Sequence, residues 1–457
     1  MDLYGSVFRR VMFPLWESRL RRRPTLEHLA SLERTQWCST DELLWLQGRA
    51  LRELVAHAYA NVPHYRAELR ALGLAPGDVS SVEHLAKLPL LTRDRAALAG
   101  DARQSAAPPY CDVSKLTGGT TGRPLRFGYD LGSEVWRHAV KLRGWGWTGY
   151  QVGQRTLYYW GPATVKTPPL VRRAKVAADR ALKREIYVDC TNRGRDDLAR
   201  VARTLRERKP ERLICYTQAG VDLARFLVEN GERVPPMPVV CCAEKLDARD
   251  RATLEAAFGP EVYETYGCRE VMLIGADCPA REGLHLSMEN LIVEVLVREG
   301  DALRPAAPGE LGEVALTDLH NYGMPFIRYL NGDRAVAGPE GRCSCGRGLQ
   351  RLESVDGRVA DTLTDAGGSP VCGILFSRIF SWSESLARTV RQWQAVQHAD
   401  GSITLKLEAR DGITDEALDD LRRNFSRYMK GVPVRTELVA DIPPGANGKR
   451  RTVLVER

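Results

Sequence analysis

The chain of 457 residues has room for one large domain and one small domain, or for two to three ordinary domains. Its composition, 44% hydrophobic and 27% charged, is that of a globular protein in water. No apolar run approaches the roughly 20 residues of a membrane-spanning helix. The run at 11–16 is too short for a signal-peptide core and leads into arginines rather than a small-residue cleavage site. We therefore expect a cytoplasmic protein without stable membrane insertion.

The formal charge of +8 is small for this length and suits anionic ligands such as nucleotides. Arg and Lys are scattered among Asp and Glu, as on solvated helix faces, whereas nucleic acids meet concentrated basic patches with interleaved aromatic side chains. Nucleic-acid binding is therefore not expected. The eleven cysteines are an odd number, which argues against a complete disulfide framework and for reduced thiols.

The order of predicted elements indicates an α/β fold. Residues 1–70 predict helices, with leucines at helical spacing up to a break at Pro63. From 117 to about 320, short apolar runs alternate with helical stretches such as 195–208 and 218–230, which is typical of an α/β domain with buried strands. The apolar runs lie at 157–160, 213–216 and 239–242.

The later part of the chain has a different pattern of predicted elements. Residues 291–340 predict a β-rich subdomain, with strands flanked by Gly/Pro turns. The last hundred residues predict a strand pair around Asp400-Gly401, a helix at 414–428 and a strand at 434–439, which together form a small α+β domain. We expect domain limits of 1–357 and 358–457.

The strongest local signal is a Gly/Thr-rich segment made of Thr117, Gly118, Gly119, Thr120, Thr121, Gly122, Arg123 and Pro124. Glycines without Cβ atoms let backbone N–H groups approach phosphates, while the threonine hydroxyls and Arg123 add donors and positive charge. The Gly-Lys-Ser/Thr ending of a Walker A loop is missing. The segment predicts a phosphate-binding loop, and the alternative is a flexible glycine loop without a ligand.

A second group of residues predicts a metal site. Three thiolates and one imidazole form a closed tetrahedral set for structural zinc, and this chain offers Cys278, His285, Cys343 and Cys345. The Cys-x-Cys spacing is tighter than usual, so the alternative is separate reduced cysteines and a packed histidine. Cys268 is the competing ligand.

In chain order, these and further motifs resemble the adenylate-forming superfamily of acyl-CoA synthetases, adenylation domains and luciferases. The nearest resemblance is to its phenylacetate-CoA ligase-like and coenzyme F390 synthetase-like branch, whose similar Cys and His placements also support the zinc prediction. The motifs lie at 62–66, 88–92, 117–124, 243–246, 266–270, 328–333, 357–358 and 448–449. Arg269 stands where the family often has Thr, which resembles the F390 synthetase-like branch.

The resemblance implies a role for each matching residue. The 117–124 loop would hold the β- and γ-phosphates of ATP, and Glu270 would help bind Mg²⁺, a cation that prefers oxygen ligands. Asp333 would accept hydrogen bonds from the ribose hydroxyls, and Arg358 would contact the ribose or a phosphate. Lys449, in isolation a solvated tail lysine, would bridge the substrate carboxylate and the α-phosphate. The nucleotide site would be completed by Ala243, Glu244, Tyr266 and Gly267.

The implied reaction joins a carboxylic acid to AMP, releases pyrophosphate and then transfers the acyl group to a thiol. Coenzyme A is the expected acceptor, while a carrier-protein thiol or a small amine stays open. A pocket of Tyr158, Trp160, Tyr216, Cys242 and Gly267 would suit an aromatic acid, unless these side chains are plain core. The C-terminal domain would rotate about Ala360 or Asp361 between the two half-reactions.

Three other functions stay open at this point. The chain could leave AMP on a non-carboxylate acceptor, or bind nucleotides without catalysis. The first 25 residues, which are basic, could also meet a membrane surface. Pairing into a homodimer is left open too.

Overall fold

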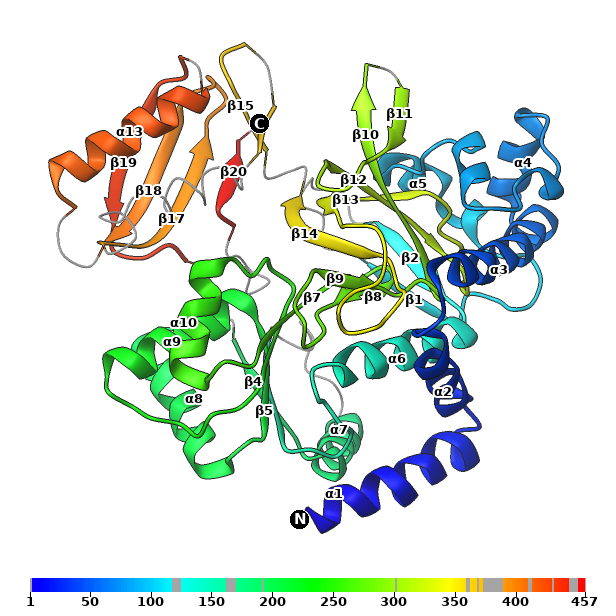
Figure 1. Ribbon diagram of the computed structural model, residues 1–457, viewed down its shortest axis with the longest axis horizontal. Coiled ribbons are helices and arrows are strands. Elements are labelled where there is room, and N and C mark those ends of the chain that lie inside the picture. Colours follow the sequence, from blue (N-terminus) through cyan, green and yellow to red (C-terminus); the bar gives the residue numbers. More distant parts are fainter. Residues whose placement is uncertain are drawn as a thin grey trace.

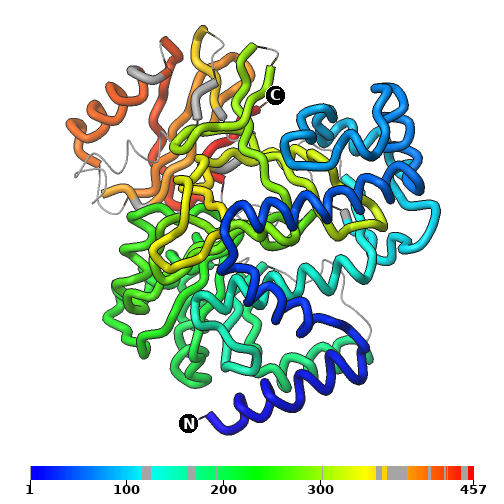
Figure 2. The backbone as a smooth tube through the Cα atoms, turned by 45° about the vertical axis from the view of Figure 1, so that its right-hand side comes forward, coloured from blue at the N-terminus to red at the C-terminus, as the bar shows by residue number. Residues whose placement is uncertain are grey.

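The computed structural model describes residues 2–116, 125–161, 170–190, 193–300, 302–358, 362–367, 370–372, 389–409, 413–429, 431–443 and 451–456. The N-terminal region is helical, as expected (Figures 1 and 2). A capping box between Ser39 and Glu42 starts α3, and Pro63 at the first position of α4 separates the two helices. The elements are α1 (Leu3–Val7), η1 (Phe8–Met12), η2 (Leu15–Leu20), α2 (Thr25–Thr35), α3 (Thr40–Asn61), α4 (Pro63–Ala71), η3 (Pro76–Asp78), η4 (Glu83–Lys87), α5 (Arg93–Ala99) and η5 (Gly100–Arg103).

One twelve-stranded sheet forms the centre of the described structure (Figure 1). Strands β4, β3, β5, β6 and β7 are parallel, and the strands beyond β7 are antiparallel. In sheet order they are β11 (Ala302–Pro305), β10 (Leu291–Glu299), β12 (Leu311–Asp318), β13 (Tyr329–Ala337), β14 (Arg351–Arg358), β9 (Leu284–Leu286), β8 (Met272–Ala276), β7 (Val262–Cys268), β6 (Val239–Cys242), β5 (Arg212–Tyr216), β3 (Thr156–Trp160) and β4 (Glu185–Asp189).

Both faces of the parallel part are buried, which explains its continuous apolar runs. Leu157 and Tyr159 share one core with helices α8 (Arg195–Arg208), α9 (Thr217–Glu229) and α10 (Ala248–Phe258). Tyr158 points to the other side, into a cluster with α6 (Leu131–Gly146) and Phe8 of the first helix. The remaining elements of this region are α7 (Leu170–Lys183) and the antiparallel pair β1 (Val113–Leu116) and β2 (Arg126–Tyr129).

The C-terminal residues have their own sheet, in the order β19-β18-β17-β20, and their own apolar core. The side chain of Gln392 donates to Asp222 Oδ1 at 3.1 Å and Arg249 donates to the Val390 carbonyl at 2.7 Å, so this part rests on α9 and α10. Its elements are β15 (Thr362–Thr364), β16 (Pro370–Cys372), β17 (Val390–Gln397), β18 (Ile403–Ala409), α13 (Asp415–Met429), β19 (Val434–Val439) and β20 (Val453–Val455).

The expected fold class is confirmed, with the predicted strands and helices at nearly the predicted residues. The strand pair around Asp400-Gly401, the helix and the last predicted strand are β17–β18, α13 and β19. Across the described ranges, no helix combines the length and the apolar content that crossing a membrane requires.

Candidate active site

Polar side chains gather where the parallel strands end, the edge at which α/β sheets bind ligands. The chain leaves β6 through Ala243, whose φ of +69° is strained for a residue with a Cβ atom. The Glu244 carboxylate then accepts a hydrogen bond from the backbone N–H of Gln218 at 2.9 Å, in the first turn of α9. The Glu244 carbonyl accepts from the Thr217 hydroxyl at 2.8 Å. Glu244, one of the residues predicted for nucleotide binding, is thus held against α9.

Asp333 on β13 is a carboxylate with a fixed orientation. It is buried, and its Oδ2 accepts hydrogen bonds from the Tyr266 hydroxyl at 2.9 Å and from the Asn331 amide at 2.7 Å. The same amide donates to the Tyr266 oxygen at 2.8 Å, and the Asp333 backbone N–H donates back to Asn331 Oδ1 at 3.0 Å. Burial, followed by the charge of Asp333, raises the pKa of Tyr266 well above its usual value, so this phenol stays a donor.

Glu270 is a second buried carboxylate beside the first. It lies between β7 and β8, and its Oε1 accepts a hydrogen bond from the Tyr329 hydroxyl at 3.3 Å. Burial raises the pKa of Tyr329, and the Glu270 charge adds to it. The Cys268 thiol has a pKa well above its usual value because of burial and the charges of Glu270 and Asp333. Both carboxylates therefore act on one thiol, and Cys268 belongs to this site rather than to the metal cluster.

Gly267 is required by the turn that presents Glu270. A Cβ atom there would overlap the Met272 carbonyl oxygen. Met272 itself has a φ of +66°, so the β7–β8 connection is tight. Gly267 thus shapes the backbone of the site.

The Gly/Thr-rich loop at 117–124 lies outside the described residues, but the flanking strand β2 is described. Phe127 of β2 contacts Phe326 at a ring-centroid distance of 6.4 Å, and both lie in one cluster with Tyr329. Phe326 in turn lies 4.4 Å from the Tyr329 ring, and Tyr329 donates to Glu270, so two aromatic side chains link the strand that leaves the loop to the Glu270 carboxylate.

The other predicted nucleotide contacts are described only in part. Arg358 is the register partner of Asp333 across β13 and β14, so their backbones are adjacent, as the proposed roles require. The residues at 359–361, with both hinge candidates, and Lys449 lie outside the described residues.

Two residues of this site went unassigned in the sequence. Tyr329 and Asn331 lie in the 328–333 motif, in which only Asp333 received a role. Alternate residues of a strand share one face, so positions 329, 331 and 333 of β13 could have been grouped on that ground. The structure brings Tyr329 to the Glu270 carboxylate and Asn331 to the Asp333 carboxylate.

The aromatic side chains predicted for an acid pocket divide into two groups. Trp160 and Tyr216, at the ends of β3 and β5, are half-buried and lie 4.7 Å apart between ring centroids. Tyr158 is core, because it is buried and stacks on Tyr187 at 4.6 Å. Cys242 is also buried, with its sulfur 3.1 Å from the Thr265 hydroxyl.

The predicted zinc ligands come together. One ligand atom from each of Cys278, His285, Cys343 and Cys345 lies within 4.8 Å of the others. A tetrahedral zinc with Zn–S of about 2.3 Å and Zn–N of about 2.0–2.1 Å sets S···S near 3.8 Å and S···N near 3.6 Å. The measured values are 3.8 Å between Cys278 and Cys343 and 3.4 Å between Cys345 and His285 Nε2. Burial, with the nearby Arg347, lowers the pKa of His285 to about 4, so the imidazole is neutral and can ligate. The four residues fit a zinc ion.

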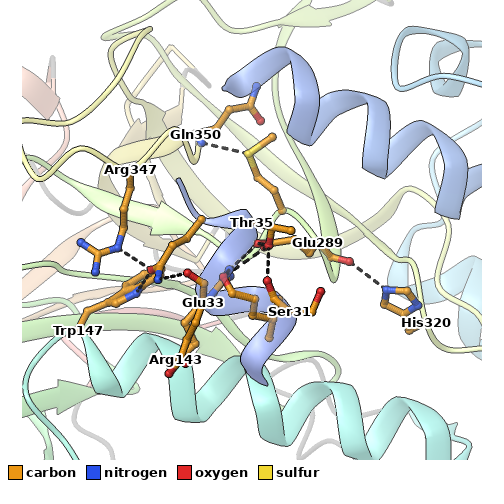
Figure 3. A network of polar contacts seen from close by, with 12 residues as sticks. Ser31, Glu33, Thr35, Arg143, Trp147, Glu289, His320, Arg347 and Gln350 are labelled. Carbon is orange, nitrogen blue, oxygen red and sulfur yellow. Dashed lines mark hydrogen bonds and ion pairs between the residues drawn. The ribbon is translucent and has the colours of Figure 1, made fainter. Parts of the chain in front are cut away.

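A polar network holds the metal-binding segment against α2 and α6 (Figure 3). The Trp147 ring lies edge-on to His285 at 5.5 Å. The Trp147 indole N–H and Arg347 Nε both donate to Gln36 Oε1, at 2.7 and 2.8 Å. Nearby, Arg143 and Thr35 each donate to Glu289 Oε1 at 2.6 Å. These contacts indicate a rigid, structural cluster.

Comparison with known proteins gave relatives over most of the chain. No protein-family model matches it. The phenylacetate-coenzyme A ligase of Aromatoleum evansii is 27% identical over 350 residues, which cover 74% of this chain and 75% of that enzyme. The enzyme of the same name from Thermus thermophilus is 24% identical over 450 residues, covering 91% and 96%.

Among solved structures, one that is similar to this chain is 2-hydroxyisobutyryl-CoA ligase in its postadenylation state, in complex with R3-HIB-AMP. The TM-score is 0.72 at 18% sequence identity, and the match covers 93% of this chain and 92% of that one. The same enzyme in its thioesterification state, in complex with 2-HIB-AMP and CoA, has a TM-score of 0.58 at the same coverage. At this identity the likeness shows the fold.

Proposed function

The chain belongs to the adenylate-forming superfamily, in its phenylacetate-CoA ligase-like branch, and from this premise we propose that it is an acid–CoA ligase. It would use ATP to convert a carboxylic acid into an acyl-AMP and would then transfer the acyl group to the thiol of coenzyme A. The observation that carries the proposal is the pair of buried carboxylates at the carboxyl edge of the sheet. Glu270 and Asp333 are each held by a tyrosine hydroxyl, in positions suited to a metal-bound triphosphate and to a ribose.

In the first half-reaction, a carboxylate oxygen of the acid attacks the α-phosphorus of ATP, and pyrophosphate leaves with the electron pair of the broken P–O bond. Asp333 would accept the ribose hydroxyl hydrogens, and the 117–124 loop would hold the leaving phosphates. Lys449 would offset the negative charge that develops between the carboxylate and the α-phosphate. Glu270 would be a carboxylate ligand of Mg²⁺, which would neutralise charge on the phosphates.

The acid is proposed to be aromatic. Trp160 and Tyr216 present two half-buried rings at the carboxyl ends of neighbouring strands. Flat rings at that spacing offer edge and face contacts to a third ring.

In the second half-reaction, the thiolate attacks the acyl carbonyl and AMP leaves. The C-terminal domain, taken as 358–457, would rotate about Ala360 or Asp361 to admit coenzyme A. A carrier-protein thiol or a small amine is the alternative acceptor. Homodimer formation and a cytoplasmic location stay predictions.

A bound zinc ion would link β8, β9 and the 343–345 segment. Its ligands would be Cys278, His285, Cys343 and Cys345. With four protein ligands it has no open position for substrate, so it would supply stability rather than chemistry.

The test is product analysis with the purified protein, ATP, Mg²⁺, coenzyme A and a set of aromatic acids. Mass spectrometry should find acyl-CoA, free AMP and pyrophosphate. A Lys449→Ala variant should lose about 10²–10³-fold in acyl-AMP formation, whereas Lys406→Ala, a lysine on β18 of the same domain, should not. AMP retained on a non-carboxylate product would instead establish an adenylyltransferase.

A further inference from the structure

The first helical segment exposes an apolar face. Residues 3–20 form one helical run, and its side chains Phe8 and Phe13 are buried against α6 and the sheet. The opposite side carries large apolar residues at four-residue intervals, and Leu3 and Val11 are 77% and 57% exposed. Globular proteins seldom expose a continuous apolar stripe without a partner. The stripe consists of Leu3, Val7, Val11 and Leu15, with Trp16 and Leu20 beside it.

Helix α7 shows the same feature. It has no buried residue, although its sequence is amphipathic. Leu170 and Val171 are 77% and 82% exposed. On a helical projection these two share one face with Ala174, Ala178 and Leu182, and Arg172, Arg180 and Lys183 lie on the other.

These two segments form one surface. The Tyr4 hydroxyl donates to the Leu182 carbonyl at 2.6 Å, and Arg184 pairs with Asp2 at 2.5 Å. Both views show the first helix and α7 at the same end of the molecule, far from the C-terminal sheet (Figures 1 and 2). We call residues 2–23 and 170–184 the basal surface.

The basal surface concentrates the positive charge of the chain. It holds twelve Arg and Lys against three Asp and Glu, a net of +9, whereas the whole chain carries +8. The rest of the chain is therefore nearly neutral. Two of the three acids, Asp2 and Asp179, are paired with basic residues of the same surface, and the third, Glu17, is buried.

We propose that the basal surface binds peripherally to a bilayer that contains anionic lipids. The exposed leucines, valines and Trp16 would enter the boundary between headgroups and acyl chains, while the arginines and lysines meet lipid phosphates. Charge selects this occupant over a second copy of the chain, since two such surfaces facing each other would repel. The large aliphatic side chains fit acyl chains rather than the bases of a nucleic acid, which stack on aromatic rings.

The placement of the basal surface is compatible with catalysis. Arg184 precedes β4, and its carbonyl accepts from the N–H of Thr156 at the start of β3, so the surface adjoins the amino edge of the parallel strands. The two carboxylates lie at the carboxyl edge. Docking would leave the nucleotide site and the C-terminal domain facing away from the bilayer.

The test is sedimentation of the full chain with vesicles of phosphatidylcholine alone and of phosphatidylcholine mixed with phosphatidylserine. Binding should require phosphatidylserine and fall as salt rises, because salt screens the charges. The double variant Arg172→Glu/Arg173→Glu should weaken binding about tenfold or more. The matched control Arg422→Glu/Arg423→Glu, on exposed positions of α13, should bind like the unchanged chain.

Substitutions that keep the charge distinguish insertion of apolar side chains into the bilayer from general electrostatic attraction of a basic protein to anionic vesicles. Val11→Ser/Leu15→Ser keeps the charge and should weaken binding at least several-fold, whereas Leu98→Ser/Leu131→Ser, at exposed positions elsewhere, should not. Brominated acyl chains should quench tryptophan emission, and Trp16→Phe should remove most of that quenching.

Three results would overturn the proposal. They are no binding to the mixed vesicles, equal binding by the basal and control variants, and a dimer in light scattering that Val11→Ser/Leu15→Ser dissociates. The last result would identify a second copy as the occupant. Near-ultraviolet circular dichroism should be unchanged in the glutamate and serine variants, because the substituted side chains are exposed and none is aromatic.

Discussion

Two sites of different character lie at the two ends of the same strands. Glu270 lies two residues before β8 and Cys278 two residues after it, at opposite ends of a five-residue strand about 17 Å long. Strand β14 makes the same crossing, because Arg351 pairs in register with His285 at one end and Arg358 with Asp333 at the other. The described residues supply all four ligands of the Cys/His cluster. In the proposed function, the carboxylate site would also need two segments outside the described residues, 117–124 and Lys449.

The difference indicates that the Cys/His cluster stabilises the fold, whereas the carboxylate site carries the proposed chemistry. The Cys/His cluster is closed and is tied by Trp147, Arg347 and Gln36 to two helices, so it can fix the strands. The carboxylate site, by the proposed function, would bind a nucleotide together with segments from elsewhere in the chain. Damage at one end should therefore change stability and damage at the other should change activity.

Cys343→Ser should give the largest effect. Losing a ligand should release the metal and lower the free energy of unfolding by on the order of 4 kcal/mol, the range typical of a lost metal site. Elemental analysis and denaturant unfolding would measure both. Cys111→Ser, outside the cluster, is the control, and a variant that keeps full stability without metal would contradict a structural role.

Glu270→Gln should lower activity without lowering stability, and so separate the role of the carboxylate site from that of the Cys/His cluster. The amide oxygen can still accept from Tyr329, so the fold and the metal content should hold, but the lost charge should lower acyl-AMP formation about 10²–10³-fold. Steady-state kinetics at varied Mg²⁺ would measure this loss. Unchanged kinetics would remove Glu270 from the mechanism.

Tyr266→Phe should have an intermediate effect. It removes the hydrogen bond that orients Asp333, worth about 1–1.5 kcal/mol, so KM for ATP should rise roughly five- to tenfold. Adenosine analogues lacking the ribose hydroxyls should be nearly insensitive to the change. If Tyr266→Phe raised KM equally for ATP and for the analogues without ribose hydroxyls, Asp333 would not contact the ribose.

Trp147→Phe should have the smallest effect. It removes the indole N–H bond to Gln36 and should cost about 1 kcal/mol of stability while zinc is retained. Thermal unfolding with metal analysis would check it. Loss of the metal would show that the ring itself holds His285 in place.

Much of the fold follows from local patterns, but several contacts do not. Apolar runs bounded by turns predicted β3, β5 and β6. Residue type, with the resemblance to the F390 synthetase-like branch, predicted the Cys/His group that the structure brings together. The capping of α9 by Glu244 joins residues 26 positions apart, which no local pattern reveals.

The alternation of side chains along a strand did not predict which aromatic residues line a pocket. Tyr158 and Trp160 both belong to β3, which is buried on two faces, and share one side of it, so alternation could not separate core from pocket. Likewise, apolar residues at helical spacing are covered in α3 but exposed in the first helical segment, and only tertiary packing distinguishes the two.

Exchange of labelled pyrophosphate into ATP is the decisive measurement of carboxylate activation. With aromatic acids present, the unchanged chain and Lys406→Ala should catalyse exchange, and Glu270→Gln should reduce it by two orders of magnitude or more. Exchange that needs no acid, or that fails with every aromatic and aliphatic acid supplied, would contradict the proposed activation of a carboxylate.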